Sequence, residues 1–464
     1  MNYVDIVNLV FGIWTTIWGL MMVHFVVLTV IGLFAKKRYP AAKVKHRYGV
    51  IIPARNEAMV IGNLIKSVQK NDYPQDKLQI FVVAHNCTDD TAKIARDLGA
   101  TVYEYNNPEE RTMGYALRYL FDQIRNDYGV EKFDGFLMFN ADNILRKNYI
   151  EKMNDAFDAT NGQSVILSFR NSKNFGTNLL SGLSSMYFLN GCIMEARGRS
   201  AVGCSTHVQG TGYVFNAKLV AEGWPYVTIT EDWEFSADQI IKGTKIEYCD
   251  EAEFFDEQPT SFKVMWRQRV RWSRGHILAC GSRFKDVLKS LFSPKKEHRN
   301  KGSLYDFLVI YVLPVVLINI GMNVLQLICL LLAPLFGCAM WPAVLGWLLG
   351  LGKMCLAYYL FMLVSCVIIF VVERKRIYGL SFGRKILIAL LWPFFIALQY
   401  VIDVVALCSH NLQWKTIPHQ DQSDFEKLNG MLGEQPAATE PAEVTDNPEA
   451  PTTTTTAVAA TKEE

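Results

Sequence analysis

The chain has 464 residues, which is too long for one ordinary domain and predicts two or three structural units. Its formal net charge is only +2, so the overall charge gives no reason to expect nucleic acid as a partner. Hydrophobic residues make up 50% of the chain and concentrate near the N-terminus and after residue 303. The ten cysteines form no C-x-x-C pair and no histidine cluster at zinc spacing, which predicts packing roles in a reducing compartment.

The first segment, residues 1–36, is predicted to be a transmembrane helix. Residues 7–34 are almost all apolar, and this run exceeds the roughly 20 residues that cross a bilayer. The run is too long for a cleaved signal peptide, and no basic region precedes it. Basic residues follow at once, so the positive-inside rule predicts a cytoplasmic location for the next domain. They are Lys36, Lys37, Arg38, Lys43, Lys45 and Arg47.

Residues 45–281 are predicted to form an α/β domain. Strand-like and helix-like segments alternate here, and this order is typical of a mostly parallel sheet with helices on its faces. Ligands of such sheets bind beyond the carboxyl ends of the strands. The strands are expected at residues 48–52, 78–84, 100–105 and 135–139, and the helices at residues 57–70, 88–98 and 112–125.

Polar segments follow three of these strands, at residues 53–57, 85–90 and 140–143. A carboxylate directly after a buried strand suits a hard divalent cation, which in turn neutralises a diphosphate. Asp142 is therefore the candidate metal ligand. Because Asp and Asn also form ordinary turns at strand ends, one such acid alone is weak evidence.

Two adjacent acids, Glu231 and Asp232, follow β-branched residues and precede a helix-like run at residues 233–241. A carboxylate at such a junction can face a cleft and act as a general base. The alternative is an ordinary helix N-terminus, where acids complement the helix dipole. Upstream, the turn at residues 209–212 contains Gly210 and Thr211, and it either lets the backbone approach a ligand closely or is a plain tight turn.

Residues 266–272 carry arginines between two tryptophans. Such a helix can clamp a pyrophosphate and stack on a sugar ring. The alternative is an amphipathic helix at the membrane interface, and both descriptions can hold together. A basic connector follows at residues 285–301, so residues 262–300 are predicted as an interfacial region.

Further membrane-spanning helices are predicted within residues 303–410. The apolar runs are residues 307–335, with a kink at Pro314, and residues 386–408. Lys353 divides a third run, so the span is expected at residues 354–372, with residues 339–352 as a loop or half-helix. Asp403 within the last span is either functional or merely close to an interface. Residues 430–464 are predicted to be disordered because their composition cannot form a core.

Taken together, these segments resemble membrane-embedded family 2 glycosyltransferases, the group that contains cellulose, chitin and hyaluronan synthases. The likeness extends over roughly residues 45–280, and it implies a Rossmann-like catalytic domain of the GT-A type with transmembrane helices on both sides. The order and spacing of five motifs carry it. They are Pro53-Ala-Arg-Asn-Glu57, Asn86-Cys-Thr-Asp89, Ala141-Asp142-Asn143, Thr230-Glu-Asp232 and Gln268-Arg-Val-Arg-Trp272.

The resemblance also implies roles for these residues. Asp232 would be the catalytic base, and Asp142 would bind Mg²⁺ or Mn²⁺. The residues expected to bind the donor are Pro53, Arg55, Glu57, Asn86, Asp89 and Asp142. Those expected to bind the acceptor or the diphosphate are Gly210, Thr211, Glu231, Gln268, Arg271 and Trp272.

Three positions depart from the family pattern. Asn140 stands where the metal motif usually begins with Asp, and His85 stands where many relatives have Asp. Met113 replaces a common Lys, so a contact to phosphate or uridine is either missing or supplied by Arg111. These changes put the identity of the donor in doubt more than the type of reaction.

The function expected from this resemblance is synthesis of a β-linked polysaccharide from a UDP-sugar, by inversion at the cytoplasmic face of the cell membrane. The product would leave through the enzyme's own helices, with an accessory export subunit as a possible partner. The first alternative is transfer of one sugar to a membrane lipid, and the second is a non-catalytic membrane scaffold. Residues 414–419 resemble an element that follows the last span in bacterial relatives, which favours a cytoplasmic C-terminal tail.

Overall fold

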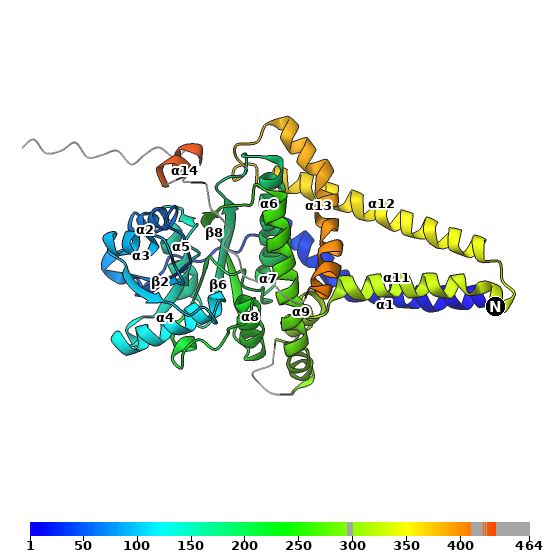
Figure 1. Ribbon diagram of the computed structural model, residues 1–464, viewed down its shortest axis with the longest axis horizontal. Helices are drawn as coiled ribbons and strands as arrows, with labels where there is room; N and C mark the ends of the chain where they lie inside the picture. The colour runs from blue at the N-terminus through cyan, green and yellow to red at the C-terminus, as the bar shows by residue number, and fades with distance from the viewer. Residues whose placement is uncertain (295–299, 410–420, 422, 424, 433–464) are drawn as a thin grey trace, which may run out of the picture.

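The computed structural model describes residues 1–294, 300–409, 421, 423 and 425–432. Its α/β domain is built on an eight-stranded sheet in the order β3-β2-β1-β4-β7-β6-β8-β5 (Figure 1). The strands are β1 Tyr48–Ala54, β2 Leu78–His85, β3 Thr101–Tyr105, β4 Gly135–Met138, β5 Ile144–Leu145, β6 Val165–Ser172, β7 Tyr213–Asn216 and β8 Ile246–Asp256.

The four predicted strands form one parallel group, in which β1 pairs with β2 and β4, and β2 pairs with β3. Strand β7 is antiparallel to both β4 and β6, while β6 and β8 are parallel. Short β5 is antiparallel to β8. The predicted fold class, a GT-A-type α/β domain with apolar helices, is confirmed, and the sheet as a whole is mixed.

Helices cover both faces of the sheet because side chains alternate along each strand. Val50 and Ile52 of β1 pack with α2 and α5 on one face, and Ile51 packs with α4 on the other. The domain's helices are α2 Ile61–Gln69, α3 Thr91–Asp97, α4 Met113–Asp127, α5 Tyr149–Ala159 and α8 Glu231–Ile241, with short 3₁₀ turns η1 Gln75–Lys77, η2 Val130–Lys132 and η4 Ala217–Val220.

A long helical element at residues 179–201 was not predicted. It consists of α6 Leu179–Asn190, a π-helical turn η3 Gly191–Arg197 and α7 Gly198–Ala201. It packs against α1 Tyr3–Phe34, where a Cβ atom added to Gly198 would lie only 1.9 Å from the carbonyl oxygen of Leu28. Such close helix packing requires glycine, so these helices form one rigid junction.

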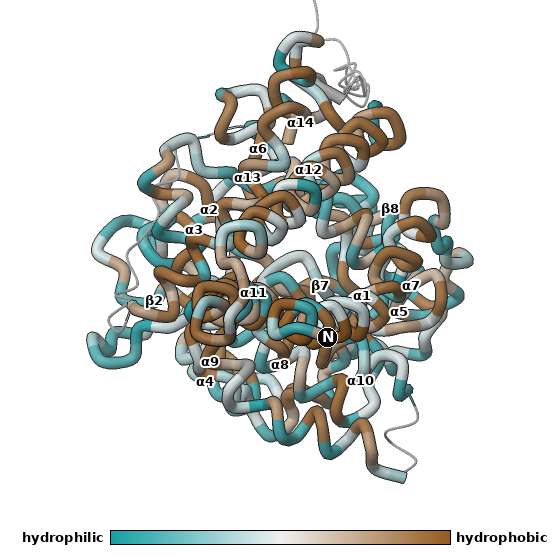
Figure 2. The backbone as a smooth tube through the Cα atoms, turned by 90° about the vertical axis from the view of Figure 1, so that its right-hand side faces the viewer, coloured by the Kyte–Doolittle hydropathy of each residue, from teal (hydrophilic) through white to brown (hydrophobic). Residues whose placement is uncertain are grey.

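Three helices are long and apolar enough to cross a membrane: α1, α12 Met340–Val372 and α13 Phe382–Cys408 (Figure 2). A fourth candidate is bent by 61° at Pro314, as predicted, between residues 301–312 and 317–331. It contains α10 Lys301–Phe307, the π-helical η6 Leu308–Val312 and α11 Val315–Leu331, and the 3₁₀ turn η7 Ala333–Phe336 follows.

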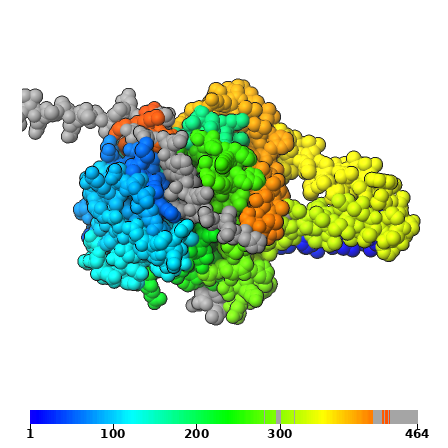
Figure 3. Space-filling model, viewed as in Figure 1, coloured from blue at the N-terminus to red at the C-terminus, as the bar shows by residue number. Residues whose placement is uncertain are grey.

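The prediction that Lys353 interrupts a span is wrong, since α12 is continuous through it. A lysine has good intrinsic helix propensity, so its charge alone does not end a helix. Helix α12 diverges from α11, and Figure 3 shows an opening between them. At the tip away from the α/β domain, α1, α11 and α12 are in contact, and Val7, Phe11, Leu330 and Val344 pack together there.

Helix α9 Phe262–Phe292 lies between the domain and α13 (Figure 1). At the other end of the chain, α14 Phe425–Leu432 packs against β5 and β8 through Phe425 and Leu428. The prediction of disorder is therefore wrong for residues 430–432, because the apolar side of this short helix is buried. Residues 414–419 and 433–464 lie outside the described part of the chain.

Candidate active site

The loops after β1 and β2 are joined by hydrogen bonds. The carboxylate of Asp89 accepts bonds from the backbone N–H groups of Ala58 and Thr91, both at 3.1 Å. The Thr91 hydroxyl accepts a bond from the N–H of Glu57 at 2.8 Å. These bonds hold residues 57–60 outside a helix, so α2 begins at Ile61 rather than at residue 57. Asp89, predicted to bind the donor, shapes the loop that carries Glu57.

The carboxyl end of β2 is also occupied by contacts within the protein. The side chain of Asn86 makes two bonds to Asn107, at 2.8 and 2.9 Å. His85 is buried, and its Nε2–H donates to the carbonyl oxygen of Glu110 at 2.7 Å. Burial lowers the pKa of His85, so the residue that replaces an acid here is a neutral structural group.

Pro53, Arg55 and Glu57 lie at the end of β1, where each is half-buried. Burial lowers the pKa of the Arg55 guanidinium, and the nearby charge of Arg111 lowers it further. Met113 packs against the apolar core at the start of α4. The structure thus brings Arg111, rather than residue 113, beside the predicted donor loop.

The Asn140–Asn143 loop is held in a defined shape. Asp142 accepts bonds from the side-chain amide of Asn143 and from the backbone N–H of Glu257, both at 3.1 Å. The hydroxyl of Thr211 donates to Asn143 and accepts a bond from the Asn140 N–H at 2.9 Å. Thr211, predicted to contact acceptor or diphosphate, is buried and braces the predicted metal loop.

The surroundings of Asp142 fit a divalent cation that is shared with the substrate. A second carboxylate, Asp256, is close: burial raises the pKa of Asp256, and the charge of Asp142 adds to the rise. Among the described residues no group of three or more His, Cys, Asp or Glu side chains could enclose a metal ion. Mg²⁺ commonly takes one or two carboxylates and completes its shell with water and substrate phosphates, which matches this arrangement.

Glu231 and Asp232 form the first turn of α8, so the helix begins two residues earlier than predicted. Asp232 accepts a bond from the N–H of Trp233 at 2.9 Å. Gly210, with φ of 76°, lies directly against it, since a Cβ atom added there would be 3.4 Å from Asp232 Oδ2. The turn at residues 209–212 therefore approaches the candidate base closely.

The protonation of the two acids is set by opposing effects. Burial raises the pKa of Glu231 and of Asp232, and the charge of Asp232 raises that of Glu231 further. The guanidinium of Arg271 on α9 lowers the pKa of both. A carboxylate whose pKa is raised toward neutrality, but which keeps a nearby cation, suits a general base.

Helix α9 is fixed against α8 on one side and α13 on the other. A Cβ atom added to Gly275 would lie 2.3 Å from Thr230 Cγ2, so the two elements touch at the start of α8. The hydroxyl of Ser273 and the amide of Gln399 both donate to Asp403, each at 2.6 Å. Asp403, predicted as either functional or interfacial, joins α9 to α13.

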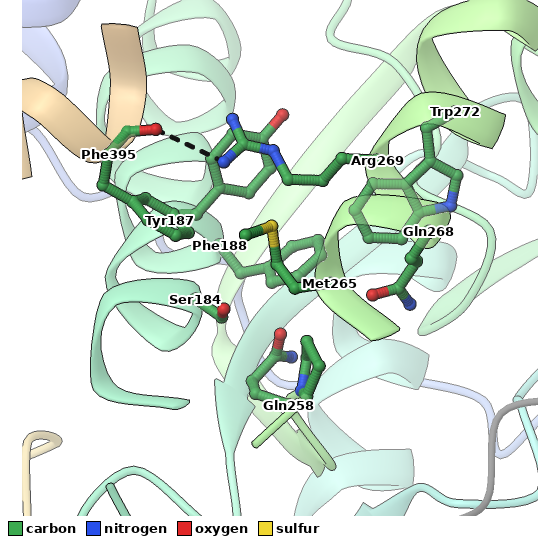
Figure 4. Close-up of a pocket in the computed structure, with 10 residues that line it drawn as sticks. Ser184, Tyr187, Phe188, Gln258, Met265, Gln268, Arg269, Trp272 and Phe395 are labelled. Carbon is green, nitrogen blue, oxygen red and sulfur yellow. Dashed lines mark hydrogen bonds between the residues drawn. The ribbon is translucent and has the colours of Figure 1, made fainter. Parts of the chain in front are cut away.

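A pocket lies between α6, α9 and α13 (Figure 4). Gln268 and Trp272 line it, and the rings of Trp272 and Phe188 meet edge to face with centroids 5.9 Å apart. Aromatic and apolar groups dominate its wall, with Gln258, Gln268 and Arg269 as polar groups among them. The lining residues are Ser184, Tyr187, Phe188, Gln258, Pro259, Met265, Gln268, Arg269, Trp272 and Phe395.

Several of these side chains were missed by the sequence analysis. Tyr187 and Phe188 lie on α6, and Gln258 follows β8, in segments to which no element or motif was assigned. Arg170 and Asp256 form a nearly buried ion pair between β6 and β8. In the sequence, Arg170 stands out as a charged residue in the largely apolar segment 165–172. This pattern indicates a buried charge, but it cannot identify the residue that pairs with it.

Comparison with known proteins supports the resemblance. Residues 46–275 match a family described as "Glycosyltransferase like family 2". Similar curated proteins include a probable glycosyltransferase (YdaM) of Bacillus subtilis, 25% identical over 50% of this chain and 55% of its own length. A β-monoglucosyldiacylglycerol synthase of Synechocystis is 25% identical over 57% of this chain and 54% of its own length. The chain thus spans about half the length of these relatives.

Among solved structures, a mannosyltransferase of Pyrobaculum calidifontis in complex with GDP-Man and Mn²⁺ is similar in fold. It aligns with a TM-score of 0.51 and 15% identity, covering 86% of this chain and 99% of its own. The GT-A-like sheet, the order of the motifs and the family match agree. Residues 46–275 of this chain are therefore a glycosyltransferase family 2 domain.

Proposed function

We propose that this chain is a metal-dependent, inverting glycosyltransferase that moves a sugar from a nucleotide-diphosphate donor to a hydroxyl group at a membrane surface. The observation that carries the proposal is that Asp232 lies against Gly210 while the charge of Arg271 favours its ionised form, on the same helix α9 that brings Trp272 to the pocket. We take Asp232 as the base, Arg271 as the cation and the pocket at Trp272 as the acceptor wall.

In this mechanism Asp232 takes the proton of the acceptor hydroxyl while that oxygen attacks the sugar carbon that bears the leaving diphosphate. A single displacement inverts the configuration and needs no covalent enzyme intermediate. Arg271 stabilises negative charge that develops during the reaction. A divalent cation at Asp142 would supply charge neutralisation at the diphosphate. The loop of Arg55 and Glu57 would hold the nucleotide, for which a UDP-sugar is the expected donor.

The acceptor that we favour is a membrane lipid that receives a single sugar. Phe395 of α13, a helix long and apolar enough to cross a membrane, lines the pocket at Trp272, which favours an acceptor that comes from the membrane. Two relatives, from Synechocystis and Nostoc, are named β-monoglucosyldiacylglycerol synthase, and diacylglycerol is thus a reasonable first acceptor to test.

A processive polysaccharide synthase is the second candidate. The aromatic rings of Tyr187, Phe188 and Trp272 in one pocket favour it, because such rings stack on successive sugars of a glycan. Export through the protein's own helices and an accessory export subunit remain predictions. A non-catalytic scaffold is less well supported, since the chain keeps both Asp142 and Asp232, the candidate metal ligand and base.

Three apolar helices indicate that the protein associates with a membrane. We propose several spans with residues 45–281 on the cytoplasmic side. The basic residues after α1 and in the loop between α12 and α13 support this orientation.

The test is transfer by the purified chain in nanodiscs that contain diacylglycerol. UDP-glucose, UDP-galactose, UDP-N-acetylglucosamine and GDP-mannose are offered with Mg²⁺ or Mn²⁺, and products are sized by gel and mass spectrometry. One sugar on diacylglycerol supports the lipid enzyme, and a long polymer supports the synthase. Absence of turnover with every donor, with no difference from Asp232→Asn, contradicts both and favours the scaffold.

A further inference from the structure

Arg170 on β6 makes contacts in three directions, although its side chain is only 11% exposed. Its Nε and Nη2 groups donate to Asp256 Oδ2 at 2.7 and 2.5 Å. Its Nη1 donates to the carbonyl oxygen of Gln209 at 3.3 Å. The guanidinium carbon lies 3.6 Å from the ring centre of Phe188. Only a planar cation with several donors can make these contacts at once.

The contact with Gln209 leads to the candidate base. Gln209 begins the turn whose next residue, Gly210, lies against the carboxylate of Asp232. Burial raises the pKa of Asp232, and the backbone N–H groups at the start of the helix lower it. The charge of Arg170 lowers this pKa as well. Arg170 therefore acts on Asp232 both through the backbone of the turn and through its charge.

The contact with Phe188 leads to the acceptor pocket. Phe188 packs edge-on against Trp272, and both rings line the pocket. Asp256, the partner of Arg170, also accepts a bond from the amide of Gln258 at 2.7 Å, and Gln258 lines the pocket. One ion pair thus supports two parts of the same pocket wall.

We propose that Arg170, held by Asp256, is a positioning residue that keeps the Asp232 carboxylate ionised and sets the acceptor wall at Phe188 and Gln258. The proposal rests on the proposed function, in which Asp232 is the base. Asp232 then has two neighbouring cations, Arg170 from β6 and Arg271 from α9. Because Arg170 also holds the pocket wall, the ionisation of Asp232 is linked to the shape of the acceptor pocket.

Two acidic groups and two cations surround Asp232. Glu231 on the same helix and Tyr213 on β7 are its acidic neighbours, and Arg271 on α9 and Arg170 on β6 are its cations. A base works in its deprotonated form, so activity rises as pH rises through its pKa. Removal of a cation makes ionisation harder and moves this rise to higher pH.

The experiment compares the pH dependence of kcat/KM for wild type, Arg170→Gln, Arg170→Lys and the control Arg146→Gln. Arg146 pairs with Glu253 on the same strand as Asp256, at 2.6 Å, and neither residue of this ion pair lines the pocket. The assay uses UDP-glucose and diacylglycerol nanodiscs, or the donor and acceptor of the panel above that give turnover.

On the acid side of the profile, called the acid limb, kcat/KM rises with pH. We expect the acid limb of Arg170→Gln to lie about one pH unit higher than that of wild type. It stays in place in Arg170→Lys, which keeps the charge, and in Arg146→Gln. Arg170→Lys loses the paired N–H bonds to Asp256 and the contact of the guanidinium with the Phe188 ring. We therefore expect its KM for the acceptor to rise by about threefold or more, while its KM for the donor stays unchanged.

An acid limb of Arg170→Gln that coincides with wild type overturns the proposal. If Arg170→Gln does not fold, Arg170→Lys decides, because an unchanged KM for the acceptor overturns the proposal and a raised one supports it. Failure of the wild-type chain to transfer sugar would appear before any variant is compared, and it would contradict the proposed function instead.

Discussion

At the scale of single residues, the candidate site depends on which of two adjacent acids faces the acceptor. Asp232 is half-buried beside Gly210, whereas Glu231 is almost completely buried in the same turn. We predict that Asp232→Asn lowers kcat by about 10²–10⁴-fold, since the amide cannot take a proton. Nucleotide affinity should stay near wild type. The measurement is turnover together with calorimetric binding of the nucleotide. Loss of turnover in Glu231→Gln but not in Asp232→Asn would assign the base to Glu231.

Asp142 should be needed for the effect of the metal ion. We predict that a chelator lowers both turnover and nucleotide affinity of the wild-type chain, because the diphosphate then lacks its counter-charge. In Asp142→Asn the gain in nucleotide affinity on adding Mn²⁺ should largely disappear. Titration of nucleotide with and without Mn²⁺ measures this, with Asp97→Asn on the exposed side of α3 as control. An equal gain in wild type and Asp142→Asn would remove Asp142 from the metal site.

At the scale of elements, the distance between α8 and α9 determines whether Arg271 reaches the acids. Gly275 permits the contact with Thr230, while Gly281 on the same helix has no atom within 4 Å of an added Cβ. We predict that Gly275→Val strongly lowers kcat by pushing α9 away, because an added side chain would overlap the short Thr230 side chain, whose Cγ2, Oγ1 and Cβ atoms lie 2.3 to 3.1 Å from the first added carbon. Gly281→Val should retain activity. Equal turnover of the two variants, measured at equal nucleotide binding, would show that this contact does not matter for catalysis.

At the scale of the whole molecule, the membrane helices hold the domain through tightly packed glycines. A Cβ atom added to Gly32 would lie 2.2 Å from the carbonyl oxygen of Ile193, whereas Gly12 on the same helix is open. We predict that Gly32→Ala destabilises the protein by about 1–3 kcal/mol and Gly12→Ala by much less. Thermal unfolding in detergent checks this as a lower Tm for Gly32→Ala alone. A matching Tm for both variants would mean that α1 packs independently of the domain.

The orientation in the membrane is a further prediction at this scale. Cys338 lies between α11 and α12, at the end of the helices away from the α/β domain (Figure 1). If the domain is cytoplasmic, an impermeant maleimide should label Cys338 in intact cells, in a variant that keeps no other cysteine. Asp76→Cys, on the exposed 3₁₀ turn before β2, should be labelled only after permeabilisation. Labelling in the reverse order would invert the proposed topology.

Much of the fold could be predicted because its signals are local. Strands β1 to β4 are short apolar runs bounded by polar turns, and the apolar helices are long runs whose composition alone meets the requirement of a bilayer. The errors occurred where a contact from elsewhere decided a boundary, as at Glu57, whose N–H is bound by Thr91. Residues 179–201 were missed because a helix buried on most sides has no clear amphipathic period.

The sequence by itself determined the class of the domain and the approximate positions of most apolar helices, because these follow from local composition. It also predicted Asp142, Asp232 and Trp272 as site residues, through the resemblance that the order of the motifs carries. Only the tertiary structure decided that Asp89 and Thr211 brace loops, that Asp403 joins α9 to α13, and that Arg170 reaches Gln209, Asp256 and Phe188 together. The physical reason is that a polar side chain takes its role from the partner it finds on burial. That partner lies far away in the chain and is fixed only when strands and helices pack.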